Sequence, residues 1–145
     1  MDKKAAFLLV VGIAVVIGVS FWLFRDQDIA FASRVFSGLV NGDKYVRDAI
    51  DWASFEAVGT DIGKNYSALP NDQAKLTYSK AFIANFSIGF NSYGLTSSSF
   101  ANWRIYGRDK TGVTVAVDGP QSKTLLFTIS NKGGKRKLVS IQWGK

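Results

Sequence analysis

The chain of 145 residues contains no cysteine and no histidine. The absence of cysteine excludes disulfides, thiol nucleophiles and cysteine-based metal sites. The absence of histidine removes the commonest general base and the commonest metal ligand. Few classes of enzyme remain open, so we expect a non-catalytic protein that carries no metal and no cofactor.

A long apolar run stands near the N-terminus. Residues 5–24 pass without a charge, and a helix of that length rises about 30 Å, the thickness of a bilayer's hydrocarbon core. Lysines precede the run, and one arginine and two aspartates follow it, which places the N-terminus inside by the positive-inside rule. We therefore expect a cytoplasmic tail over residues 1–4, a transmembrane helix and signal anchor over 5–24, and a domain over 25–145 outside a bacterial inner membrane.

Two features of this run have alternatives. A cleaved signal peptide would end near Ala30-Phe31-Ala32, but the run is longer than usual for such a peptide and its end is bulky, which favours an uncleaved anchor. Ala14 and Gly18 form a small-xxx-small pair. The pair either packs against another helix in the membrane or belongs to a plain anchor.

Positive charge gathers towards the C-terminus. The net charge is +7, and residues 102–145 alone hold nine Lys and Arg against Asp109 and Asp118. The densest cluster lies at a predicted hairpin tip and comprises Lys132, Lys135, Arg136 and Lys137. Such a basic patch is either a solvated turn that discourages aggregation or a docking surface for an anionic lipid or an acidic partner. We expect no nucleic-acid partner, because an exported domain rarely meets one and because such binding favours aromatic residues interleaved with the basic ones.

Three segments after the apolar run have the period of a helix. The first, residues 29–40, follows the capping residue Asp28 and ends before Asn41-Gly42. The second is short, and residues 59–72 after it are predicted as a loop. The third and longest is expected over 73–93, with an aromatic ridge of rings four residues apart: Tyr78, Phe82, Phe86 and Phe90.

After residue 99 the apolar period changes from that of a helix to that of a strand. Four alternating segments are joined by short turns rich in Gly, Asp and Asn, which indicates an antiparallel meander. The apolar face of such a sheet needs a cover, and the helices are the cover available. We therefore expect an α+β fold, with the transmembrane helix followed by about three helices packed on one face of a curved four-stranded antiparallel sheet.

Four features occur together: Gly42-Asp43 between two helices, the step Ile50-Asp51-Trp52, the aromatic helix 73–93 and the closing strand 137–143. Their order resembles the nuclear-transport-factor-2-like superfamily, also called the cystatin-like α+β cone. With the predicted anchor, the topology is similar to that of the inner-membrane assembly factors of type IV secretion systems.

The resemblance implies a pocket between sheet and helices. In the superfamily's isomerases and cyclases an Asp or His works with a Tyr in proton transfer, so the catalytic candidates would be Asp51, Asp61, Tyr78 and Tyr106. Asp51 is alternatively a capping or surface residue. A lipid or other apolar ligand would instead be lined by large rings, which alternatively just fill the core: Trp52, Tyr78, Phe82, Phe86, Phe90 and Trp103.

The anchor and the scarcity of catalytic groups together favour one function. We expect a single-pass membrane protein whose outer domain mediates protein–protein interaction and assembly in a cell-envelope complex, with other envelope proteins or further copies of itself as partners. The first alternative is a module that binds a lipid or another apolar ligand. The second is a small isomerase-like or cyclase-like enzyme.

Overall fold

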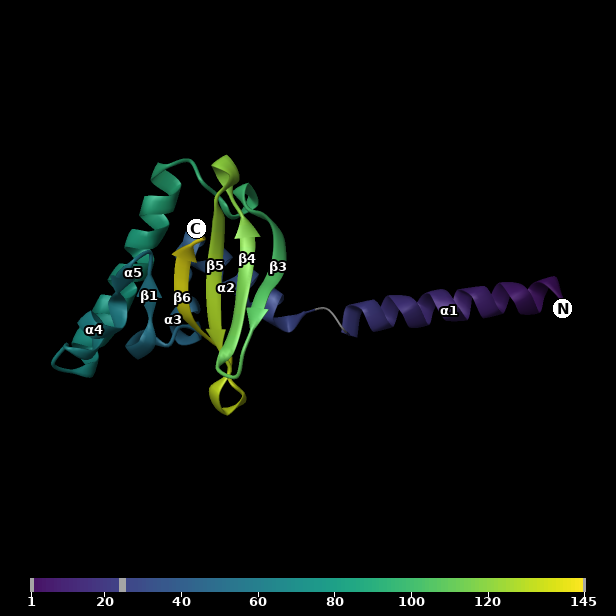
Figure 1. Ribbon diagram of the computed structural model, residues 1–145, viewed down its shortest axis with the longest axis horizontal. Coiled ribbons are helices and arrows are strands. Elements are labelled where there is room, and N and C mark those ends of the chain that lie inside the picture. The colour runs from purple at the N-terminus through teal and green to yellow at the C-terminus, as the bar shows by residue number, and fades with distance from the viewer. Residues whose placement is uncertain (1, 24–25, 145) are drawn as a thin grey trace.

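The structure is a computed structural model that describes residues 2–23 and 26–144. Within these residues the chain is α+β, with five α-helices and one six-stranded mixed sheet (Figure 1). The helices are α1 (Lys3–Leu23), α2 (Gln27–Asn41), α3 (Val46–Ala49), α4 (Ile62–Ser67) and α5 (Asp72–Ser92). The strands are β1 (Glu56–Ala57), β2 (Thr60–Asp61), β3 (Ala101–Arg108), β4 (Gly112–Asp118), β5 (Thr124–Ser130) and β6 (Lys137–Trp143).

The sheet combines a meander with two short added strands. Strands β3 to β6 pair antiparallel in sequence order. Strand β1 then pairs with β6 in parallel, with Glu56 opposite Ser140, and β2 pairs antiparallel with β1. The predicted four-stranded antiparallel sheet is therefore wrong. Strands β1 and β2 have two residues each, too short to show an alternating pattern, and β2 lies inside the segment predicted as a loop.

Helix α2 is the central helix of the fold. The Asp26 carboxylate caps its first turn by accepting the N–H groups of Asp28 at 2.9 Å and Ile29 at 3.4 Å. The predicted cap, Asp28, therefore lies two residues further on, within the first turn. Gly42 ends the helix with a φ of 71°, a conformation that glycine adopts at little cost. The buried side of α2 carries Phe31, Ala32, Val35, Phe36, Leu39 and Val40.

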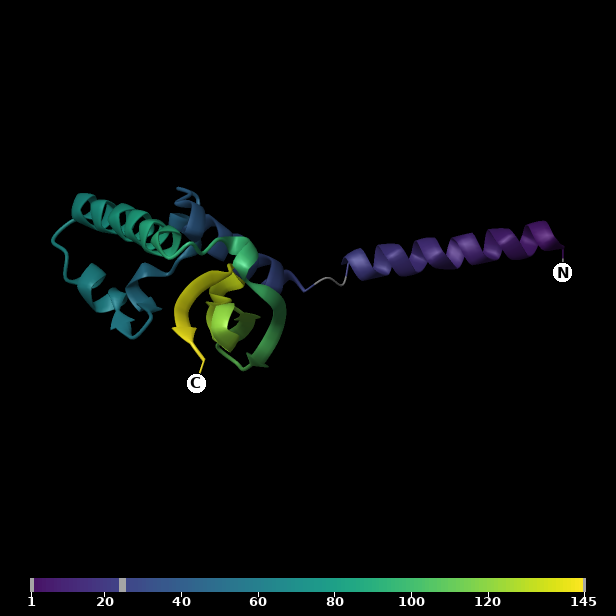
Figure 2. The same ribbon diagram turned by 90° about the horizontal axis from the view of Figure 1, so that it is seen from above.

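The core lies between the helices and the sheet. Seen from above, the sheet forms a curved layer with α2 and α5 beside it (Figure 2). Phe36 of α2 is fully buried, and its ring centroid lies 4.8 to 5.9 Å from those of four other aromatic residues: Phe90, Phe100, Trp103 and Phe127. Most of these contacts are edge-to-face, a favourable geometry for aromatic pairs. Phe36 therefore stabilises the packing of α2 on the sheet, where it contacts Phe127 of β5.

An ion-pair network joins the start of α2 to the sheet. Arg108, the last residue of β3, contacts Asp26 at 2.6 Å and Asp28 at 3.0 Å. Arg136, just before β6, donates from Nε to the other Asp28 oxygen at 2.8 Å. Burial alone would raise the pKa of Asp28, but hydrogen bonds and charge from Arg136 and Arg108 outweigh burial and hold that pKa below its ordinary value. The network fixes where α2 meets both strands.

Helix α1 leads away from the α+β body, with the N-terminus at its far end (Figures 1 and 2). Across the described ranges, no helix is long and apolar enough to cross a membrane. The predicted transmembrane helix, signal anchor and inner-membrane location are therefore wrong. The prediction was an uncharged helix over residues 5–24, and Phe24 lies outside the described residues. The observed helix α1 begins with Lys3 and Lys4 and ends at Leu23.

Candidate anion-binding pocket

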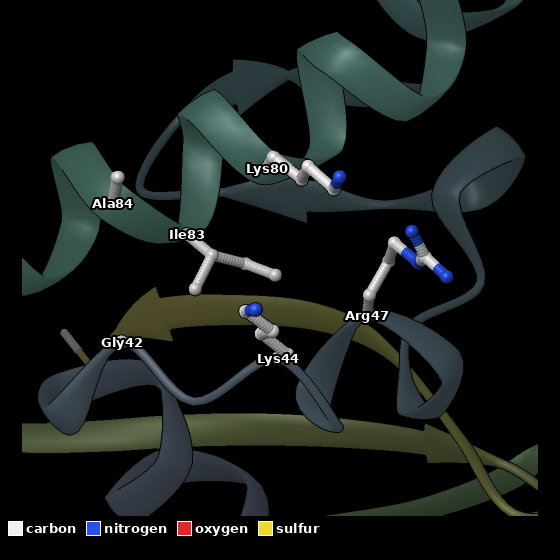
Figure 3. Close-up of a pocket in the computed structure, with 6 residues that line it drawn as sticks. All are labelled: Gly42, Lys44, Arg47, Lys80, Ile83 and Ala84. Atoms are coloured by element: carbon white, nitrogen blue, oxygen red, sulfur yellow. The ribbon is translucent and has the colours of Figure 1, made fainter. Parts of the chain in front are cut away.

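A pocket of about 420 Å³ opens between α5 and the chain that links α2 to α3. Figure 3 shows Lys80 on the α5 side of the opening and Lys44 and Arg47 on the side that faces it. The side chain of Ile83, 5% exposed, forms the apolar floor. We call this site the α3–α5 pocket, lined by Gly42, Lys44, Arg47, Lys80, Ile83 and Ala84.

The turn after α2 positions Lys44. Gly42 donates its N–H to the carbonyls of Gly38 and Leu39, and the N–H of Asp43 also reaches Gly38 at 2.8 Å. This pattern reverses the chain within two residues and satisfies carbonyls that the helix end leaves free. Lys44 therefore leaves the turn directly beside the pocket.

Two close approaches position Arg47. A Cβ at Gly38 would lie 2.2 Å from Cγ2 of Val46, so the absence of a side chain there lets α3 pack directly on α2. On the other side, the indole N–H of Trp52 donates to the Arg47 carbonyl at 2.9 Å, and Lys137 donates to the Asp48 carbonyl. The backbone of α3 is thereby held between α2 and β6.

The opposite wall is fixed by hydrogen bonds between helices. The Ser87 hydroxyl donates to the Val40 carbonyl at 2.7 Å, and the Asn91 amide donates to the same oxygen at 3.1 Å. Both donors lie on α5, and Val40 lies in the last turn of α2. These bonds set the distance between the two helices, and with it the width of the pocket.

The pocket combines positive charge with an apolar floor. Among the residues that the structure describes, Lys44 and Lys80 form no ion pair. Arg47 has one carboxylate neighbour, Asp48, at 3.9 Å, and 85% of the Asp48 side chain is exposed. Exposed pairs of this kind contribute little energy. Three cations therefore face a site where an anion with an apolar part would be favoured.

The predicted aromatic residues gather elsewhere. Along α5, the rings of Phe86 and Phe90 stack with centroids 4.8 Å apart, and Phe82 contacts both Trp52 and Phe55. Trp103 packs on Phe36 and Phe127, and Tyr78 on Tyr66. The rings thus contact one another and the core, and the α3–α5 pocket is lined by other residues.

The predicted basic patch is divided by the structure. Arg136 bonds Asp28, and Lys137 bonds the carbonyl of Asp48, so both hold the fold together. Lys132 and Lys135 are exposed at the hairpin tip. Ala14 and Gly18 both fall on α1, away from the pocket.

The four catalytic candidates do not converge on one point. Asp61 caps α4 by accepting the N–H of Lys64 at 2.9 Å. The backbone of Asp51 bonds Leu138, and Tyr106 is 68% exposed on the edge strand β3. For the described ranges, no hydrogen bond joins a carboxylate to Tyr78 or Tyr106. Nor do three Asp or Glu side chains gather there as a metal site.

Sequence reasoning missed the α3–α5 pocket because no local pattern marks it. Lys44 and Arg47 lie in a short turn and helix, and Lys80 is more than thirty residues away on a helix noted only for its rings. The one available signal was Gly42-Asp43, which correctly marked the end of α2.

The fold and the pocket together define a small α+β domain with a cavity lined by three cationic side chains. No family model, curated protein or solved structure matches the chain. The likeness to the nuclear-transport-factor-2-like superfamily therefore stays a prediction.

Proposed function

We propose that this protein is a non-catalytic interaction domain that binds an acidic segment of a partner protein in the α3–α5 pocket. The observation that supports the proposal is that Lys44, Arg47 and Lys80 line one pocket from two sides, together with the apolar side chain of Ile83. Carboxylates flanking an aliphatic side chain would complement both parts of the site. Hydrogen-bonded charge pairs would set the orientation, and the aliphatic group would cover Ile83.

The expected strength of this interaction follows from its exposure. Each solvent-exposed ion pair contributes about 0.2–1 kcal/mol, and burial of one aliphatic side chain contributes about 1.5–3 kcal/mol. Association costs absorb much of that sum. The pocket alone therefore supports weak binding that falls as salt increases, which suits a transient partner.

The test measures binding of a fluorescent six-residue peptide of alternating aspartate and leucine to the full chain, by anisotropy at low and high salt. The double variant Lys44→Gln/Lys80→Gln should bind about tenfold more weakly. The matched control, Lys132→Gln/Lys135→Gln, removes the same charge from the exposed hairpin tip and should bind like the wild type.

Three outcomes would contradict the proposal. Equal weakening in both double variants would mean that net charge, and not the pocket, attracts the peptide. Laurate that binds while the peptide does not would identify an amphiphile site. Self-association that the peptide displaces would identify a second copy of this chain as the occupant.

A further inference from the structure

A second hollow lies beside the α3–α5 pocket along the same helix. It has a volume of about 270 Å³, and Arg47 borders both cavities. Its other walls come from the first half of α5, through Lys75, Leu76 and Ser79, and from Trp52 and Tyr66. The two cavities therefore share one lining side chain, the guanidinium group of Arg47.

The second hollow has different chemistry. The rings of Trp52 and Tyr66 stack with centroids 5.9 Å apart and planes inclined by 25°. The Lys75 ammonium lies 5.5 Å from the Tyr66 centroid, and the carboxylates of Asp48 and Asp72 border the opening. Trp52 is only 7% exposed, so the aromatic surface of this hollow belongs mainly to the half-buried Tyr66 ring. The positive and negative groups of the hollow balance, so this aromatic surface, and not net charge, distinguishes it from the α3–α5 pocket.

Helix geometry gives the spacing between the two cavities. The first cavity touches α5 at Lys80, Ile83 and Ala84, and the second touches it about two turns earlier. Two turns correspond to about 10 Å along a helix axis. An extended peptide covers that distance in about three residues.

We propose that the two cavities form one groove that binds an extended segment, with an acidic and aliphatic part in the α3–α5 pocket and an aromatic side chain about three residues away on Trp52 and Tyr66. This inference rests on the proposed function and specifies its ligand. Arg47 lies at the junction, where its planar fork of N–H donors can bind a carbonyl of the peptide backbone.

The experiment compares three peptides on the full chain by anisotropy. The first peptide contains acidic and aliphatic residues only. The second adds a phenylalanine three residues after the last acidic residue. The third adds the phenylalanine directly after the last acidic residue. The second should bind about five- to tenfold more tightly than the first, because the ring is buried against the aromatic wall. The third should gain little, because its ring cannot reach.

A variant pair assigns the gain to the groove. Tyr66→Leu should abolish the gain while leaving the first peptide unaffected, and Tyr106→Leu, at a ring that is 68% exposed on β3, should preserve it. Thermal unfolding of each variant verifies that it is folded. A Tyr66→Leu chain that does not fold is replaced by Lys75→Gln, which should weaken the second peptide alone.

The possible failures are distinguishable. A gain that is equal at both spacings, or that survives Tyr66→Leu, would overturn the groove. Binding of the first peptide that depends on Lys44 and Lys80, with no gain from the ring, would leave the proposed function standing and refute only the groove. Absence of binding by all three peptides would refute both.

Discussion

Two groups of cations in this molecule differ in how they are paired. Arg108 and Arg136 contact Asp26 and Asp28 at 2.6 to 3.0 Å, so their charge is matched and part-buried. The cations of the α3–α5 pocket, Lys44, Arg47 and Lys80, face an opening, and only Arg47 has a neighbouring carboxylate, at 3.9 Å, among the described residues. The pairing of each cation, and not the density of charge along the chain, therefore separates the cations that hold the fold together from those that remain available to a ligand.

The largest expected effect on stability comes from a substitution that disrupts the ion pairs of Arg108 and Arg136. Asp28→Asn should lower the free energy of unfolding by about 2–3 kcal/mol, because both guanidinium groups lose a charged acceptor at a part-buried site. Chemical denaturation at neutral pH measures the change. Asp48→Asn is the control, since its side chain is 85% exposed and its pair is long, and it should change stability by less than about 0.5 kcal/mol. Equal effects in the two variants would mean that the network is as weak as a surface pair.

A smaller effect appears as pH falls. The pKa of Asp28 is below its ordinary value of 3.8 in the folded protein, so the unfolded chain binds its proton first. The stabilisation by Asp28 is therefore complete above pH 3.8 and is lost as pH falls through the folded pKa. Denaturation of the wild type and of Asp28→Asn across acidic pH should show the difference between them shrinking. Asp109 also has a lowered pKa, from hydrogen bonds with Thr111 and Gly112, but it is common to both proteins and cancels. A difference that stays constant to the lowest pH would refute the ionic origin.

The smallest expected effect belongs to the second group. Lys44→Gln and Lys80→Gln should each change the free energy of unfolding by less than about 0.5 kcal/mol, because both lysines are exposed. Thermal unfolding measures this directly. A large loss in either variant would show that these lysines support the fold, and the contrast between the two groups would disappear.

The periodic elements were predictable from sequence. The alternation in the last third of the chain correctly placed β3 to β6, and the helix predicted over 73–93 is α5, at Asp72–Ser92. The strands and this helix have long, regular patterns of apolar residues, so contacts with the rest of the fold do not change their secondary structure. The α+β class follows from them. The two-residue strands β1 and β2 were not predicted, because the pairing of β1 with β6 depends on residues that are distant in the chain.

The candidate site was not predictable for a related reason. The pocket exists because Gly38 permits α3 to approach α2 and because Ser87 and Asn91 bond Val40 across the helices. The basic patch was visible as a run of Lys and Arg, yet half of it is engaged by Asp28 and by the carbonyl of Asp48, and sequence alone does not show such partners. The aromatic ridge was visible as a period of four, and it lies in contact with the core.

The hydrogen bonds to the carbonyl oxygen of Val40 have a consequence for how the groove would bind a peptide. Val40 of α2 accepts hydrogen bonds from both Ser87 and Asn91 of α5, and Phe36 of α2 also packs on Phe90 of α5, so polar and aromatic contacts together join the two helices. We therefore expect the pocket between these helices to be preformed and not to close around its ligand like a hinged clamp. Selectivity at this groove would then depend on the shape and length of the bound peptide, because binding would require little conformational change in the protein.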